Sequence, residues 1–580
     1  MRRGAETREY ISKRFIVRSF WIFGFFVFFS IILILRSSYL QVLNKDFLIH
    51  QGNLRQLKTV DIAAYRGTIT DRNNKTLAIS IPVDHIKIYP KKFDKNTEEF
   101  NELAILIEKD PNELRKSIQN ALNGNKTFLY IKKNVETSIS NKIKILEIPN
   151  LELERNYKRS YPAGKIVSQL LGLTSDEKGL EGIERQKGLE GIERQYDGSL
   201  KGVSGKKTVL RDRYKRQIEN IEIIKSPQAG MDLTLSIDLR LQHIAYKALE
   251  SAVIKNQAIS GSAILVDVLN SEILAIANHP TYDNNKRRSM IPALMRNRAI
   301  IDMYEPGSSI KPFIIARAIE TGDYDNSSII DTSPVRIGSR NISDASDLGF
   351  VDLPTVLMRS SNAGMSRIAL SLESDKLWGL MSDFGFGSYA TDGFPGESRG
   401  QLHHHSEWGE IGKATMSYGY GISVTPIQLA QAYAAIANKG VNKPLSLRKN
   451  NQNEGKRIIK EETASKILKM LEKVVVDGTS KKAKVEGYRV GGKSGTVWKI
   501  SGTGGYSNDR YRAIFAGVAP IENPRLVAVV LIDEPTGEFY YGGDVAAPVF
   551  SEIISESLQL LAIPPNENVI ESVLLAESSN

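Results

Sequence analysis

The chain has 580 residues and no cysteine, and 41% of its residues are hydrophobic and 25% charged. This balance excludes a disordered protein, a fibrous repeat and a polytopic membrane protein, and the missing cysteines exclude disulfides, a thiol nucleophile and iron–sulfur clusters. The net charge of +11 indicates an anionic surface nearby, but the charge is spread along the chain, which disfavours nucleic acid as the partner.

The first predicted element is an uncharged apolar segment of 17 residues, 19–35. As a helix it is just long enough to cross a bilayer core of about 30 Å. Six basic residues and two acidic ones precede it, which predicts a cytoplasmic tail over 1–18, an anchor over 19–36 and an exported remainder. A cleavable signal peptide is the alternative; the apolar run is too long for one, and no small-residue cleavage site follows it.

Residues 37–225 are polar and mixed in composition, and we expect them to form a pedestal domain of short strands and helices. Helical spacing extends over 97–122, where Asp110-Pro111 is expected to separate two helices. A turn cluster followed by the alternating sequence LTLSID opens a second predicted domain over 226–562. The acidic tail over 563–580 is expected to be loosely held.

The second domain begins and ends with predicted hairpins, at 260–278 and 512–535, and its middle is mostly helical in pattern. Strands at both ends with helices between them predict an α+β fold, in which one antiparallel sheet packs against a helical cluster.

The nonapeptide KGLEGIERQ occurs twice in succession, at 178–186 and 187–195. A nine-residue step turns a helix by about 900°, so two copies in one helix would present opposite faces. We therefore expect the second copy to occupy the structured position and the first to bulge outward. The paired glutamates of the copies, including Glu190 and Glu193, are interpreted as helix surface rather than as a glycosidase pair.

Three short motifs follow one another in the second domain. Ser308 and Lys311 form an S-x-x-K motif, in which one helical turn brings a neutral amine to the hydroxyl whose proton it can accept. Of four such patterns in the chain, this one follows Pro-Gly, a turn that puts the serine at a helix start, where backbone N–H groups can stabilise an oxyanion. The other two motifs are S-x-N at Ser360, Ser361 and Asn362, and K-S-G-T at Lys493, Ser494, Gly495 and Thr496.

This ordered trio resembles the signature of serine acyl enzymes that bind penicillin. Longer stretches, such as GYRVGGKSGT at 487–496 and FYYGGDVAAPVFSEI at 539–553, are similar to class B penicillin-binding proteins, most of all the septal peptidoglycan D,D-transpeptidases of Gram-negative bacteria. In the pedestal, an R-G-x-x-x-D-R-N element at 66–73 and an R-x-Y-P-x-G element at 159–164 also resemble the family. Departures are Asn74, where the family commonly has Gly, Ser309, where it often has Thr, and Ser346, in the place of a family His.

The resemblance implies acyl transfer in two steps, with Ser308 attacking the D-Ala–D-Ala carbonyl and Lys311 as general base. The N–H groups of Ser308 and Thr496 would form the oxyanion hole. Ser360 would pass the proton to the leaving amine, with Lys493 tuning its hydrogen bonds. An amine of a neighbouring stem would then attack the acyl-enzyme and form the cross-link.

Substrate binding is implied for the remaining motif residues. Asn362 would hold the substrate amide. Ser494, Gly495 and Thr496 would line the substrate and oxyanion site, where the two hydroxyls and the charge of Lys493 would bind the terminal carboxylate. No metal or organic cofactor is implied.

The implied partners are peptidoglycan stem peptides, β-lactams, the inner membrane, a septal membrane glycosyltransferase and other division proteins, with the catalytic domain in the periplasm. The alternatives are an elongation-type transpeptidase, a D,D-carboxypeptidase, a β-lactamase and a non-catalytic β-lactam sensor or scaffold. The intact trio disfavours a silent protein, and the anchor with its pedestal disfavours a carboxypeptidase or β-lactamase.

Two other features are interpreted as loops rather than as ligand sites. Three adjacent histidines, 403–405, cannot easily ligate one ion with good geometry, so we expect a solvated loop there. The glycine-rich segment 501–511 lacks the strand-to-helix context of a phosphate loop, and we expect a mobile loop beside the K-S-G strand.

Overall fold

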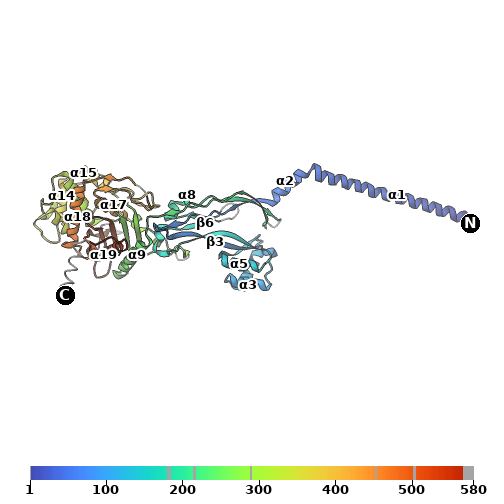
Figure 1. The fold of residues 1–580 in the computed structure, drawn as a ribbon, viewed down its shortest axis with the longest axis horizontal. Helices are drawn as coiled ribbons and strands as arrows, with labels where there is room; N and C mark the ends of the chain where they lie inside the picture. The colour runs from blue at the N-terminus through green and yellow to red at the C-terminus, as the bar shows by residue number, and fades with distance from the viewer. Residues whose placement is uncertain are drawn as a thin grey trace.

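A long N-terminal helix, a strand-rich pedestal and a larger α+β domain follow one another along an elongated molecule (Figure 1). The structure is a computed structural model that describes residues 2–178, 184–212, 217–287, 290–450, 453–500 and 505–565. The N-terminus lies at one end of the molecule and the larger domain at the other, with the pedestal between them (Figure 1).

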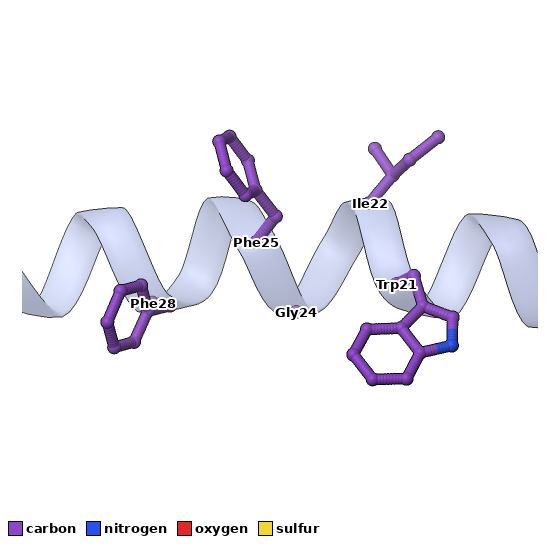
Figure 2. A pocket seen from close by; sticks show the side chains of 5 residues that line it. All are labelled: Trp21, Ile22, Gly24, Phe25 and Phe28. Atoms are coloured by element: carbon purple, nitrogen blue, oxygen red, sulfur yellow. The ribbon is translucent and has the colours of Figure 1, made fainter.

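The N-terminal helix α1 covers Arg2–Ser38, and the apolar stretch able to cross a membrane covers Arg14–Leu43. The helix is longer than the predicted anchor because nothing in the flanking basic sequence breaks it. Gly24 leaves a shallow notch between the rings of Trp21 and Phe28, and Figure 2 shows that the side chains around it all come from α1. These side chains are exposed, so the notch belongs to the outer surface of the helix. A π-turn at Tyr39–Leu43 and α2 (Lys45–Gln56) lead into the pedestal.

Two larger sheets and the two-stranded sheet of β6 and β7 build the described part of the pedestal. The first is antiparallel and joins β1, β8 and β9. The second has the order β10-β2-β3-β4, with β5 paired to β3, and β10 pairs with β2 in parallel. The strands are β1 (Leu57–Ile62), β2 (Ile69–Thr70), β3 (Thr76–Ile88), β4 (Leu129–Glu136), β5 (Leu151–Ser160), β6 (Thr174–Lys178), β7 (Glu184–Gly188), β8 (Gly205–Arg211), β9 (Gln217–Lys225) and β10 (Leu233–Thr234). The sequence LTLSID, expected to alternate as a strand, forms only the two residues of β10, because the chain then turns into the first helix of the larger domain.

The predicted helix break at Asp110-Pro111 is confirmed. Asp110 caps the second helix by accepting hydrogen bonds from the N–H groups of Asn112 and Glu113, and Pro111 occupies the first turn, where its missing N–H costs nothing. The pedestal helices are α3 (Glu98–Leu106), α4 (Pro111–Asn123), α5 (Thr137–Ile145), α6 (Ser168–Leu171), α7 (Gly191–Gln195) and α8 (Asp197–Leu200). The first three pack on β3 and β4 around a core of their own.

The second copy of the nonapeptide occupies the structured position, as predicted. It forms α7, where Ile192 is fully buried. The interpretation of Glu193 as helix surface is wrong: it is 0% exposed, and its two carboxylate oxygens each lie 2.7 Å from an arginine Nε, one in Arg66 and one in Arg159. Three charged groups from distant segments meet here because a buried carboxylate needs both cations and hydrogen bonds. The predicted bulge of the first copy falls on 179–183, outside the described residues.

The larger domain is built on one antiparallel sheet in the order β12-β11-β21-β20-β19, which confirms the α+β prediction. Its strands are β11 (Ser260–Asp267), β12 (Ile273–His279), β19 (Gly491–Ile500), β20 (Tyr506–Ala519) and β21 (Leu526–Asp533), so both predicted hairpins are present. Side chains alternate between the faces: Leu265 packs toward α9 (Leu239–Lys255) and α19 (Gly542–Leu560), and Ile264 packs toward the helical cluster. The strand β19 lies at the edge of the sheet.

The helical cluster covers the other face, with the fully buried α17 (Pro426–Ala437) against β11 and β21. Its remaining helices are α10 (Pro292–Met295), α11 (Arg298–Ile301), α12 (Lys311–Thr321), α13 (Leu353–Met358), α14 (Asn362–Ser371), α15 (Ser374–Asp383), α16 (Glu410–Met416) and α18 (Glu461–Val476). Short strand pairs connect them: β13 (Ile329–Asp331) with β16 (Phe350–Asp352), β14 (Val335–Ile337) with β15 (Arg340–Ile342), and β17 (Val441–Asn442) with β18 (Lys456–Arg457).

The R-G-x-x-x-D-R-N element joins the pedestal to the larger domain. Asp71 accepts a hydrogen bond from the N–H of Leu239, at the start of α9, and Arg72 forms an ion pair of 3.1 Å with the buried Glu272. Asn74 has φ +61°, a left-handed conformation that asparagine tolerates better than most residues, so this departure from glycine keeps the turn.

Candidate active site

Ser308 lies in a short 3-10 turn, Gly307–Ile310, that leads directly into α12. Gly307 has φ +55°, so the turn before the serine uses a conformation that favours glycine. Ser309, the departure in the second place of the motif, is buried, and its Oγ donates a hydrogen bond of 2.7 Å to the carbonyl oxygen of Pro306. This hydrogen bond stabilises the turn. Ser308 lies at the start of the helix, as the sequence predicts, and is partly exposed.

The edge strand β19 brings the K-S-G-T motif against this turn. A Cβ atom on Gly495 would lie 2.6 Å from the carbonyl oxygen of Pro306, so only glycine allows so close an approach. A Cβ on Gly307 would in turn lie 3.7 Å from the backbone N of Thr496. The backbone of β19 at Gly495 and Thr496 therefore packs directly against the turn Gly307–Ile310 that carries Ser308.

Lys311 connects the first two motifs. Its Nζ lies within hydrogen-bond distance of the Ser360 carbonyl oxygen (2.7 Å), the Ser360 Oγ (3.2 Å) and the Asn362 Oδ1 (2.7 Å). Ser360 holds φ +60°, a strained conformation for a serine that is typical of functional sites. The amine of Lys311 thus contacts two residues of the S-x-N motif, while Lys311 itself lies one helical turn from Ser308.

Two buried lysines set the electrostatics of the site. Lys311 is 0% exposed, and burial, reinforced by the charge of Lys493, holds the pKa of its amine well below the usual range. Burial also lowers the pKa of Lys493 to about 7. A buried amine next to a second buried amine favours the neutral form, which is the form that a general base needs.

Asp344 is a site residue that the sequence analysis missed. From the loop between β15 and β16, its carboxylate accepts hydrogen bonds from the Ser361 hydroxyl and from the N–H groups of Asn362 and Ala363. It therefore fixes the start of α14, and its negative charge opposes the fall of the Lys311 pKa. The family resemblance at this segment pointed to Ser346, and nothing local indicates that an aspartate 18 residues from Asn362 meets it.

The side chains of the K-S-G-T motif, which the family resemblance assigns to substrate binding, have partners within the protein. The Thr496 hydroxyl accepts a hydrogen bond of 2.9 Å from the N–H of Gly542, which leaves its own proton free to donate. The Ser494 hydroxyl accepts one of 3.0 Å from Ser480, and Lys493 Nζ donates one of 3.0 Å to the Ser494 carbonyl. Each of these two hydroxyls accepts a hydrogen bond within the protein, so each keeps its own proton to donate, which is consistent with binding a carboxylate.

Two other features were singled out in the sequence, the three histidines and the glycine-rich segment 501–511. His403 and His404 are exposed as predicted, but the ring of His404 also packs on Trp378 at 5.0 Å between centroids. Among the described residues, no group of three or more His, Cys, Asp or Glu is placed to hold a metal ion. The prediction of a loop over 501–511 is wrong for residues 506–511, which belong to strand β20 and pair with β19. Residues 501–504 lie outside the described residues.

Comparison with known proteins identifies the family. The penicillin binding protein transpeptidase domain matches residues 261–555, and the penicillin-binding protein dimerisation domain matches 61–235. The chain is 40% identical over 547 residues to the probable peptidoglycan D,D-transpeptidase PbpC of Pseudomonas aeruginosa, covering 93% of this chain and 94% of that protein. It is 37% identical over 539 residues to the peptidoglycan D,D-transpeptidase FtsI of Escherichia coli K12, covering 92% and 90%.

The chain is also similar to solved structures of penicillin-binding proteins and peptidoglycan synthetases. The transpeptidase domain of penicillin-binding protein 3 from Burkholderia pseudomallei is 40% identical, with a TM-score of 0.53 over 57% of this chain and 97% of that one. A peptidoglycan synthetase from Bifidobacterium adolescentis is 26% identical, with a TM-score of 0.69 over 88% and 98%. The chain belongs to the class B penicillin-binding proteins, the family of serine-type peptidoglycan D,D-transpeptidases.

Proposed function

We propose that this protein cross-links peptidoglycan stem peptides at the division septum, through an acyl-enzyme on Ser308. One observation carries the assignment of roles: the buried amine of Lys311 lies on Ser360 and Asn362 while its own motif places it one turn from Ser308. A neutral amine in this position accepts the Ser308 proton as the Oγ attacks the carbonyl of the penultimate D-Ala.

The remaining steps are consistent with the same geometry. The N–H groups of Ser308 and Thr496 are proposed to stabilise the oxyanion, and Ser360 to pass the proton to the departing D-Ala amine. Asn362 is proposed to hold the substrate amide, and Lys493, with the hydroxyls of Ser494 and Thr496, the terminal carboxylate. An amine from a second stem then attacks the acyl carbon, Ser308 Oγ leaves, and the peptide cross-link forms.

The same site would acylate with β-lactams, and the alternatives differ in the fate of the acyl-enzyme. A carboxypeptidase or β-lactamase passes the acyl group to water, whereas a transpeptidase keeps the acyl-enzyme until an amine arrives. An elongation-type enzyme shares the chemistry and differs in where the cell uses it. The septal assignment is supported by 37% identity to FtsI of E. coli over most of both chains.

The apolar helix α1 and the similarity to FtsI make this a single-pass protein of the inner membrane. We propose that the basic N-terminal tail is cytoplasmic and that the catalytic domain is periplasmic, because the positive charges precede the helix. We further propose a division into pedestal and transpeptidase domains near residue 226, with a septal membrane glycosyltransferase and other division proteins contacting the anchor and the pedestal.

The test is intact-mass spectrometry of the full chain in detergent, with and without a penicillin. A stable single adduct that is lost in Ser308→Ala supports the proposal. Ser204→Ala, in another S-x-x-K pattern of this chain, is the matched control and should keep the adduct. No adduct with the penicillin intact would indicate a silent protein, and no adduct with the penicillin destroyed would indicate a β-lactamase.

A further inference from the structure

Ser480 is a fully buried serine in the turn that follows α18, and its side chain contacts the K-S-G-T motif. Its Oγ donates a hydrogen bond of 3.0 Å to the Oγ of Ser494, which lies 14 residues further along the chain. Lys493 Nζ donates to the carbonyl oxygen of Ser494, so Ser494 is held both at its backbone and at its side chain. The mechanism proposed above assigns no role to Ser480.

The turn that carries Ser480 packs tightly against the start of α19. A Cβ atom on Gly543, in the first turn of α19, would lie 2.4 Å from the carbonyl oxygen of Thr479. On the other side, the N–H of Ser480 donates a hydrogen bond of 3.3 Å to the carbonyl oxygen of Val474, in the last turn of α18. Because the backbone is fixed on both sides, the Ser480 hydroxyl is held in place next to Ser494.

The two hydroxyls of the K-S-G-T motif receive their hydrogen bonds from different kinds of donor. Thr496 Oγ1 accepts from the backbone N–H of Gly542, at the start of α19, whereas Ser494 Oγ accepts from the side chain of Ser480. A hydroxyl has one proton, so a hydroxyl whose oxygen already accepts a hydrogen bond keeps that proton for another group. The donor to Ser494 is a side chain, so its contribution can be measured by substitution.

We propose that Ser480 is a positioning residue that orients the Ser494 hydroxyl toward the terminal carboxylate of the donor stem. The inference rests on the proposed function, in which Ser494 donates a hydrogen bond to that carboxylate. The hydrogen bond from Ser480 polarises the Ser494 hydroxyl and makes it a stronger donor. Without Ser480, the Ser494 hydroxyl is free to rotate, and substrate binding has to order it.

Two thioester donors measure this effect on the full chain in detergent. In both, Ser308 Oγ attacks the thioester carbonyl carbon and a thiol leaves. The thiol of one donor carries a free carboxylate, and in the other donor this carboxylate is a methyl ester. Because the chain has no cysteine, a thiol reagent detects only the released thiol, which gives kcat/KM for acylation.

Ser480→Ala should lower kcat/KM for the carboxylate donor about fivefold, the loss expected for one hydrogen bond between uncharged groups. The value for the methyl ester should change less than twofold. In a Ser494→Ala chain, Ser480→Ala should have no further effect, because the hydroxyl through which it acts is missing.

Ser557→Ala is the matched control and should leave both values unchanged. Ser557 is fully buried in α19, and in the part of the chain that the structure describes its hydroxyl has no hydrogen-bond partner.

Unchanged values in Ser480→Ala, or an equal fall for both donors, would overturn the inference and would mean that Ser480 only contributes to packing. A rise for the carboxylate donor would also overturn it, because Ser494 would then be donating its proton to Ser480. A wild type that releases thiol from neither donor would instead contradict the proposed function, and the inference with it. The two failures are distinguishable because the first requires an active wild type.

Discussion

Asp344 accepts a hydrogen bond from the backbone N–H of Asn362, across 18 residues of sequence. The same carboxylate binds the hydroxyl of Ser361, so one acidic side chain holds the central and last residues of the S-x-N motif in place. The position of Asn362 against Lys311 therefore depends on a residue outside all three motifs.

Replacing Asp344 with Asn should slow the acylation of Ser308 by penicillin about tenfold, since it weakens a charge-assisted contact at the start of α14. The charge of Asp344 raises the pKa of Lys311. Without it the amine loses its proton at lower pH, so the rising limb of the acylation rate against pH should move to lower pH. Asp347→Asn, in the same loop, is the control and should leave the acylation rate and its pH profile unchanged. Equal effects of the Asp344 and Asp347 substitutions would contradict the role of Asp344.

Replacing Lys493 with Met should abolish acylation and stabilise the transpeptidase domain by about 2 kcal/mol at pH 7. The folded state lowers the pKa of Lys493 from 10.5 to about 7 by burial. The wild type therefore loses stability as pH falls from 10.5 toward 7, and the loss is complete below pH 7. Thermal unfolding of both chains from pH 6 to pH 10 checks this, and a gap that widens with rising pH would refute it.

Replacing Glu193 with Gln should destabilise the pedestal by about 3 kcal/mol, because Arg159 would lose its buried counter-charge and Arg66 would keep only its ion pair with Asp197. Calorimetry of the full chain should show the pedestal transition at lower temperature. Arg194→Gln, on the exposed side of the same helix, should leave the transition within about 0.5 kcal/mol of the wild type.

Deleting residues 178–186 should leave the pedestal transition and penicillin acylation close to those of the wild type. Deletion of either copy of KGLEGIERQ yields the same sequence, so the remaining glutamate still reaches the two arginines. The hairpin of β6 and β7 is what the deletion removes. Adding Glu193→Gln to the deleted chain should lower the transition again, and a deleted chain that is already unstable would show that the first copy contributes to the fold.

Replacing Gly495 with Ala should reduce penicillin acylation by about a hundredfold. The added Cβ would lie 2.6 Å from the Pro306 carbonyl oxygen and would push β19 away from the turn that carries Ser308. Gly379→Ala, in α15, meets nothing within 4 Å and should leave acylation unchanged. Measured rates that fall equally in both variants would indicate a general loss of folding.

Local patterns predicted much of the fold. The break at Asp110-Pro111 follows from the geometry of proline, and the hairpins of the larger domain follow from short apolar runs joined by turns. The three motifs were visible because each is local, and the turn at Gly307 put Ser308 where the pattern placed it.

The contacts between distant segments were not visible in the sequence. Glu193 meets Arg159 across 34 residues and Arg66 across 127, and its spacing alone resembles that of a surface glutamate. Asp344 carries no periodic signal either, because it lies in a loop that the fold brings to the start of α14. Burial of a charged side chain is decided by which segments converge on it, and a single sequence does not record that.

The length of the pedestal sets the distance between the N-terminal helix and the transpeptidase domain. Its longest strand, β3, has 13 residues and spans about 40 Å. The anchor enters at one end of the pedestal and the catalytic domain sits at the other (Figure 1). If α1 anchors the chain in the membrane as proposed, we expect the pedestal to hold Ser308 away from the bilayer, by a distance that the length of the pedestal sets.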